Sequence, residues 1–152
     1  GEGGLILAKP TTFMNNSGDA VQKILHYYIK EAPLIPPSPP LLRGARGDLS
    51  SVLTIINDYL DLIIGNYKIR TRPSGAVGQA DSSGAVGHNG VQSIIDRLGT
   101  KNFRRVKIGV EMKEGRAARK IPGEKFVLQK FKKEEMEIIK KLLPEIIKKI
   151  MG

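Results

Sequence analysis

Short runs of β-branched and other apolar residues alternate along this chain with segments that have helical apolar periodicity. We expect strands over residues 5–8, 52–56, 67–72 and 103–112, and helices over residues 18–30, 90–98 and 132–151. Strands that alternate with helices favour an α/β fold, because the helices cover the apolar faces of the sheet. The run Val52–Ile56 predicts a buried parallel strand, and Pro144 predicts a kink or a new segment in the last helix.

The composition narrows the class of protein. The 152 residues contain no cysteine and two histidines, which excludes disulfides and thiolate metal sites and argues against a histidine-rich metal site. No apolar run approaches the length of a membrane span, and no signal-peptide pattern opens the chain, so we expect a cytoplasmic protein.

Charge is unevenly distributed along the chain. The net charge is +10, and residues 101–152 hold 16 Lys and Arg against 7 Asp and Glu, whereas residues 1–100 hold 9 against 8. Such a polarised charge suits a polyanionic partner such as RNA. A solvated lysine-rich surface without such a partner is the alternative.

Two segments interrupt the alternation of strands and helices. Residues 33–49 include five of the nine prolines, which favours an exposed linker or insertion; a proline-motif ligand or an Arg-Gly contact to RNA is the alternative. Residues 73–87 contain the sequence SGAVG twice, nine residues apart. Two copies do not make a repeat array, so we expect a duplicated glycine-rich loop.

Candidate functional residues fall at the ends of the predicted elements. Met14 and Asn15 lie between the first predicted strand and the first predicted helix, for which Ser17 is the expected N-cap. In open α/β sheets, ligands bind at such turns. Asp58 follows the run of residues 52–56 and is expected at the carboxyl end of that strand.

His88 and Asn89 open another predicted helix, where free backbone N–H groups and the helix dipole favour negative charge. Amide donors beside a helix N-terminus suit the oxyanion of an acyl transfer, and a carboxylate near a histidine suits the orientation of a general base. We therefore expect Asn15, Asp58 and His88 to converge. Taken singly, each of these residues is also explained as a turn or cap residue.

Several segments, in order, resemble motifs of the bacterial-type peptidyl-tRNA hydrolase family. They are KPTTFMNNSG, NDYLDLIIGNYKIRTRPSG, AVGHNGVQSII, NFRRVKIGVEM (the family has N-F-x-R-(L/V)-(K/R)-I-G-I-G) and GEKFVLQKFKKEE. The resemblance implies a single α/β domain over residues 1–152 with a mixed β-sheet flanked by helices. Residues 33–49 are then an insertion, and residues 73–87 a lengthened loop.

The resemblance also implies an activity, which is hydrolysis of the ester between a peptide and the 3′ end of tRNA, so that the tRNA is recycled. The family needs no metal or cofactor, and we expect a monomer whose partner is peptidyl-tRNA. On the family's pattern, the catalytic residues here are Asp58, which orients the general base, together with Asn15 and Asn89.

Further residues match the family's substrate contacts. Met14, Gly87 and His88 match positions that contact the substrate, and Arg70 and Lys107 match a basic pair that binds the 5′ phosphate of tRNA. A phosphate contact positions an RNA without reading its sequence.

The sequence departs from the family's pattern at its beginning. Family members have a first strand, a glycine-rich loop and a general-base histidine before the Lys-Pro-Thr motif, and here eight residues precede Lys9. We therefore expect a sheet without the family's amino-terminal strand, and little hydrolysis by this truncated chain unless His88 replaces the base. The alternatives are a non-catalytic RNA-binding remnant that uses Arg70, Arg104 and Lys107, and a chain that does not fold.

Overall fold

The computed structural model describes residues 5–28, 49, 51–70 and 88–152. The chain divides into two compact units, one formed by Gly1–Val52 with Arg72–Phe103 and the other by Leu53–Thr71 with Arg104–Gly152. The predicted insertion, except Leu49, and the predicted glycine-rich loop lie outside the described residues.

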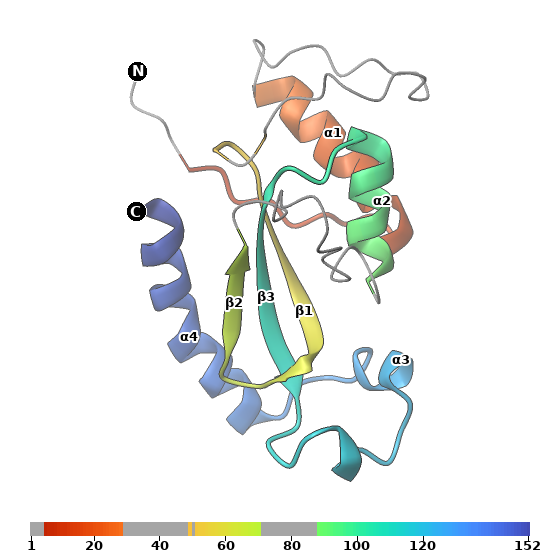
Figure 1. Cartoon of the computed structure of the whole chain (residues 1–152), viewed down its shortest axis with the longest axis vertical. Coiled ribbons are helices and arrows are strands. Elements are labelled where there is room, and N and C mark those ends of the chain that lie inside the picture. Colours follow the sequence, from red (N-terminus) through yellow and green to blue (C-terminus); the bar gives the residue numbers. More distant parts are fainter. Residues whose placement is uncertain (1–4, 29–48, 50, 71–87) are drawn as a thin grey trace, which may run out of the picture. The chain divides into compact units, whose positions relative to one another are not determined.

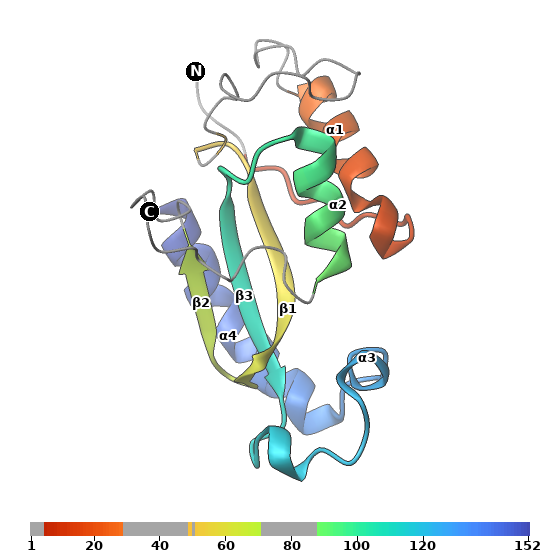
Figure 2. The same ribbon diagram turned by 45° about the vertical axis from the view of Figure 1, so that its right-hand side comes forward.

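The first unit is built on two packed helices, α1 (Ser17–Tyr28) and α2 (Asn89–Leu98), which lie side by side in both views (Figures 1 and 2). Their apolar positions recur at helical spacing, which is why both helices were predictable. The buried residues on the facing sides are Val21, Leu25, Val91, Ile94 and Leu98.

The entry into α1 differs from the prediction. A single 3₁₀ turn, η1 (Met14–Asn16), runs directly into α1, so the helix begins at Ser17. The backbone N–H groups of Asn16 and Ser17 already donate to the carbonyls of Phe13 and Met14. Because the chain is helical before Ser17, the prediction of Ser17 as N-cap was wrong.

The prediction of a first strand over residues 5–8 was also wrong. This segment has no regular secondary structure, and Leu7 is 78% exposed. An apolar run becomes a strand only when a neighbouring backbone pairs with it. None of the described strands pairs with this run.

The second unit contains a sheet of three described strands in the order β1-β3-β2 (Figure 1). They are β1 (Thr54–Ile63), β2 (Tyr67–Arg70) and β3 (Arg104–Glu111). Strand β1 runs parallel to β3 and β2 runs antiparallel to it, which confirms a mixed sheet. Strand β1 starts later and ends later than the predicted strand. It is an edge of the described sheet and leaves Ile56 exposed, so the prediction of a buried strand was wrong.

Helix α4 (Lys133–Met151) packs on one face of this sheet, where Leu142 and Ile146 bury Val106. Arg104 of β3 holds the C-terminal end of α4, because the Arg104 Nη1 donates to the Ile150 carbonyl at 2.7 Å. The helix continues through Pro144 as one element, so no new segment starts there. Proline removes one helical hydrogen bond, and burial of the flanking Leu142 and Ile146 offsets that loss.

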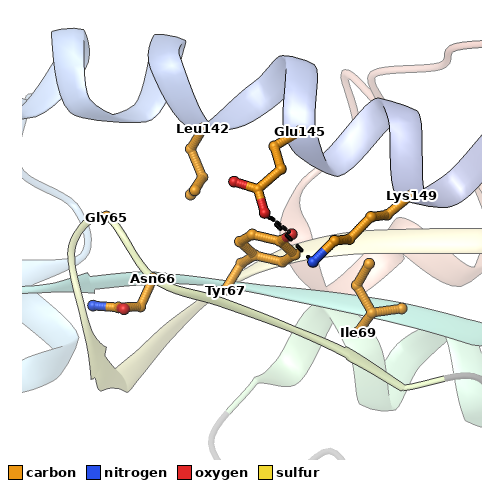
Figure 3. A pocket seen from close by; sticks show the side chains of 7 residues that line it. All are labelled: Gly65, Asn66, Tyr67, Ile69, Leu142, Glu145 and Lys149. Carbon is orange, nitrogen blue, oxygen red and sulfur yellow. Dashed lines mark hydrogen bonds and ion pairs between the residues drawn. The ribbon is translucent and has the colours of Figure 1, made fainter.

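Strand β2 and α4 also share a polar contact, drawn in Figure 3. The Tyr67 hydroxyl donates to Glu145 Oε1 at 2.7 Å, and Lys149 Nζ lies 3.4 Å from the same oxygen. The hydrogen bond from Tyr67 and then the contact with Lys149 lower the pKa of Glu145, while Tyr67 and then Glu145 raise the pKa of Lys149. These groups line an open pocket of about 450 Å³ whose floor includes Leu142.

The segment between β3 and α4, for which we expected no helix or strand, contains two short helical turns. They are η2 (Arg116–Ala118) and α3 (Gly123–Phe126). Within the described ranges, no helix has both the length and the apolar character needed to cross a membrane.

Candidate active site

The first half of the candidate site is the N-terminus of α2. His88 is the N-cap, and its Nδ1 accepts a hydrogen bond from the backbone N–H of Val91 at 3.2 Å. Asn89, the first residue of the helix, is exposed. The first-turn N–H groups and the helix dipole make this end favourable for a developing negative charge.

The turn η1 lies against this helix end. A Cβ atom on Gly90 would be 2.8 Å from Met14 Cγ and 3.0 Å from His88 Cε1, so both side chains lie against the bare α-carbon of Gly90. Asn15 is the next residue of η1 and is exposed. The structure therefore brings together Met14 and His88 from two segments that the sequence singled out separately.

Gly18 provides a second close approach between the two segments. Its N–H donates to Ser93 Oγ at 3.0 Å, and a Cβ atom on Gly18 would be 2.7 Å from Arg97 Cβ and would clash with the Ser93 carbonyl. Asp19 and Arg97 form an exposed ion pair beside this contact, at 2.8 Å. A small residue at position 18 lets α1 approach α2, which fixes η1 against the α2 N-terminus.

Asp58 lies within β1, not at its carboxyl end, so that prediction was wrong. The strand continues to Ile63 because the parallel register with β3 holds as far as Tyr59 and resumes, after an irregularity, at Ile63. Asp58 is exposed and lies opposite Ile108. The preceding residue, Asn57, is buried. Its Nδ2 donates to the Asp58 carbonyl at 2.7 Å, and its Oδ1 has no hydrogen-bond partner among the described residues.

The predicted basic pair belongs to a larger basic face. Arg70 lies opposite Arg105, and Lys68 lies opposite Lys107 across the antiparallel pairing of β2 with β3. Because strand side chains alternate, these four cations share one face of the sheet, and α4 covers the other. Lys107 is only 4% exposed, and its Nζ lies 4.5 Å from the centre of the Tyr59 ring.

Sequence reasoning missed Lys68, Arg105 and Tyr59 on this face. The sequence predicted a strand over residues 67–72, but only the register with β3 shows which cations lie opposite one another. By the same alternation, Asp58 projects from the face opposite to that of Arg70 and Lys107.

A buried ion pair was also missed. Glu111 and Arg119 are almost fully buried, with Nη1 and Oε2 3.1 Å apart, although the two atoms are not aligned for a hydrogen bond. The Arg119 guanidinium also lies over the Phe126 ring, 5.6 Å from its centre. This pair ties η2 and α3 to the end of β3.

Asp58 belongs to one unit, and Met14, Asn15, His88 and Asn89 belong to the other. The meeting of Asp58 with His88 stays a prediction, and Gly87 lies outside the described residues. Over residues 5–28, 49, 51–70 and 88–152, no group of three or more histidine, aspartate or glutamate side chains is placed to hold a metal ion.

Comparison with known proteins gives a consistent result. The sequence model of a family described as peptidyl-tRNA hydrolase matches residues 42–151. The peptidyl-tRNA hydrolase of Aquifex aeolicus is 35% identical over 147 residues, which cover 97% of this chain and 60% of that protein. The peptidyl-tRNA hydrolase of Metamycoplasma arthritidis is 38% identical over 139 residues, covering 91% and 57%. The chain thus spans about three fifths of the length of these relatives.

Two solved structures have the same fold. A peptidyl-tRNA hydrolase in complex with N-propanol gives a TM-score of 0.58 at 22% identity, over 93% of this chain and 55% of that one. The peptidyl-tRNA hydrolase from Acinetobacter baumannii gives 0.59 at 22% identity, over 93% and 56%. The family model matches more than half of the chain, and this match shows that the chain belongs to the peptidyl-tRNA hydrolase family.

Proposed function

We propose that this chain acts in the hydrolysis of the ester between a peptide and the 3′ end of tRNA, in the cytoplasm, where tRNA is used. The observation that carries the proposal is the contact of Met14 and His88 around Gly90 at the N-terminus of α2. A helix N-terminus flanked by exposed amide side chains is suited to the oxyanion that forms when an ester is attacked.

Each candidate residue has a distinct role in this proposal. Asn15 and Asn89 are exposed amides on either side of that contact, and they hold the ester carbonyl and its oxyanion. Met14 packs against the peptide or the terminal ribose, and Gly87, which lies outside the described residues, is a further substrate contact on the family's pattern. Asp58 orients the general base, which in the family is a histidine that precedes the Lys-Pro-Thr motif.

His88 positions the helix end and does not take the proton. Its Nδ1 accepts from the Val91 N–H, so in the neutral ring Nε2 carries the hydrogen and is a donor. A ring in that state hydrogen-bonds substrate oxygen better than it abstracts a proton from water.

The basic face of the sheet supplies the affinity for tRNA. Arg70 and Lys68 are exposed on this face, and the half-buried Arg105 and the buried Lys107 add positive charge beside them. Phosphate contacts of this kind set the position of an RNA and make its binding salt-dependent.

A specific observation favours a second candidate, a non-catalytic RNA-binding protein. All four cations of the basic face belong to one unit, so this face does not depend on residues of the other. Tight, salt-dependent binding of tRNA without hydrolysis would favour this alternative.

The test uses peptidyl-tRNA and measures peptide release and binding separately. Asn89→Ala should reduce the rate of release more than the affinity. Arg70→Gln should weaken the binding of 5′-phosphorylated tRNA by about tenfold, as expected for one lost charge-assisted contact, and should have no effect on dephosphorylated tRNA. Lys140→Gln, an exposed change on α4, is the matched control. Absence of release with intact binding selects the second candidate, and equal effects of Arg70→Gln on both tRNAs refute the phosphate contact.

A further inference from the structure

Lys107 differs from the other three cations of the basic face because it is buried. Arg70 and Lys68 are exposed and Arg105 is half-buried, whereas only 4% of the Lys107 side chain is exposed. A phosphate group that approaches this face therefore meets the exposed side chains first. Direct contact does not explain how Lys107 would contribute to the binding of an anion.

The residues that lie opposite Lys107 carry no negative charge. In the pairing with β1 this residue is Asn57, and in the pairing with β2 it is Lys68. The β-carbons of such opposite residues are about 5 Å apart, and like charges there repel each other. Burial adds to this cost, because an ammonium group loses its hydration when it leaves water. A charged lysine in this place needs favourable contacts on its remaining sides.

The ring of Tyr59 provides such a contact. Lys107 Nζ lies 4.5 Å from the centre of this ring, which is within the range of a cation–π interaction. The face of an aromatic ring attracts a cation without adding a negative charge, and the attraction is strongest where water is excluded. A carboxylate in the same place would cancel the charge of the ammonium group. The ring therefore stabilises the ammonium group and leaves its positive charge intact.

The course of β1 explains why the Tyr59 ring lies toward Lys107. Tyr59 is opposite Gly109, which shares a face of β3 with Lys107. The parallel register is interrupted directly after Tyr59. Beyond this point the β1 backbone passes over Gly109, since a Cβ atom on Gly109 would be 2.6 Å from the Leu62 carbonyl oxygen. Backbone fills the space over Gly109, and the ring occupies the side nearer Lys107.

We propose that Tyr59 is a positioning residue for the binding of the 5′ phosphate of tRNA. Its ring holds the Lys107 ammonium group charged within the basic face, and the field of this buried charge strengthens the attraction of the phosphate to Arg70 and Lys68. Charges that are separated by protein interact several times more strongly than charges in water, and salt screens them less. This role rests on the proposed function, because it requires a phosphate on the basic face.

The ratio of the affinities for 5′-phosphorylated and dephosphorylated tRNA measures this effect. Tyr59→Leu should lower the ratio about fivefold, as expected for the loss of one desolvated cation–π contact. Tyr59→Phe retains the ring and should keep the ratio of the wild type. Tyr27→Leu, the same change at a tyrosine of α1 that is 71% exposed, is the matched control and should not change the ratio. A general structural defect would weaken the binding of both tRNAs alike.

A double-mutant cycle tests whether Tyr59 acts through Lys107. Lys107→Gln should lower the affinity ratio at least as much as Tyr59→Leu does. Adding Tyr59→Leu to Lys107→Gln should then lower the ratio no further, because the cation that the ring holds is already absent. Independent losses in the double variant overturn the proposal.

Nuclear magnetic resonance of the wild-type chain tests the contact without relying on a substitution at Tyr59. The ring current should shift the ε-methylene protons of Lys107 upfield, and these signals are assigned by their absence in Lys107→Gln. Unshifted signals overturn the proposal.

The binding data separate failure of this role from failure of the proposed function. An affinity ratio that falls in Lys107→Gln but not in Tyr59→Leu overturns the role of Tyr59 and leaves the phosphate contact standing. Equal affinities of the wild-type chain for the two tRNAs refute the phosphate contact itself, and the role of Tyr59 with it.

Discussion

Replacing Gly18 by alanine tests the reasoning about how η1 is held against α2. Gly18 is buried in α1, where its α-carbon faces the backbone of α2. An added Cβ would lie 2.7 Å from Arg97 Cβ and 2.8 Å from the Ser93 carbonyl carbon, whereas ordinary contact begins at 3.4 Å. The helices would have to separate by more than half an ångström. The main obstacle is backbone, so no side-chain rotation can relieve it.

Three contributions to the free energy of unfolding determine the expected effect of Gly18→Ala. Overpacking of this kind costs about 1–3 kcal/mol. The separation also weakens the hydrogen bond from Gly18 N–H to Ser93 Oγ, which contributes about 1 kcal/mol. Alanine recovers up to about 1 kcal/mol through its higher helix propensity. Gly18→Ala should therefore destabilise the protein by about 1–3 kcal/mol.

Urea unfolding followed by far-ultraviolet circular dichroism measures this loss. Lys23→Ala, on the exposed side of the same helix, should change the free energy of unfolding by less than about 0.5 kcal/mol. Ser93→Ala removes only the hydrogen bond and should cost about 1 kcal/mol. If Gly18→Ala is as stable as the wild type, or more stable, then helix propensity dominates and the close packing of α1 on α2 is refuted.

Three further substitutions test other contacts. Tyr67→Phe should lower the Tm above pH 4.5, and the difference from the wild type should shrink as the pH falls below 4.5. The reason is that the Tyr67 hydrogen bond lowers the pKa of Glu145, so the stabilisation from this bond is lost when Glu145 is protonated. A difference in Tm that does not change with pH would contradict this. Glu111→Gln leaves the Arg119 guanidinium buried without its counter-charge, so it should lower the free energy of unfolding, measured in urea, by about 3 kcal/mol. Changing Arg119 to Gln as well should restore most of this loss. Additive losses in the double variant would argue against the ion pair. Gly90→Ala should leave the fold intact but displace the η1 side chains, and unchanged methionine methyl NMR signals would refute that contact.

The helices were predictable because their signals are local. In α2, the apolar spacing, His88 before the first turn and Gly99 after the last turn all lie within one stretch of sequence. The structure shows His88 as the N-cap and Gly99 at φ 65°, in the left-handed region that glycine adopts without strain. Strand β3 also follows from its alternating pattern.

The errors concern features that depend on a partner distant in sequence. Residues 5–8 have the composition of a strand, but a strand also needs a neighbour to pair with. Asp58 was placed at a strand end because it follows the apolar run of residues 52–56, yet pairing with β3 extends β1 to Ile63. Register, not composition, decided both the length of β1 and the face on which Asp58 lies.

At position 111 the sequence differs from the family's motif, and contacts in the structure explain how the different residue is accommodated. The motif that resembles residues 102–110 continues with glycine, and here Glu111 stands at that point. A buried glutamate is unfavourable unless it is paired, and Arg119 supplies the charge while Met112 N–H donates to the second oxygen at 3.0 Å. Gly123 then lies against the Arg119 guanidinium and Leu60 Cδ1 of β1. Glu111 is therefore compensated by Arg119, and the contacts of Arg119 and Leu60 with Gly123 link the segment after β3 to the strand that carries Asp58.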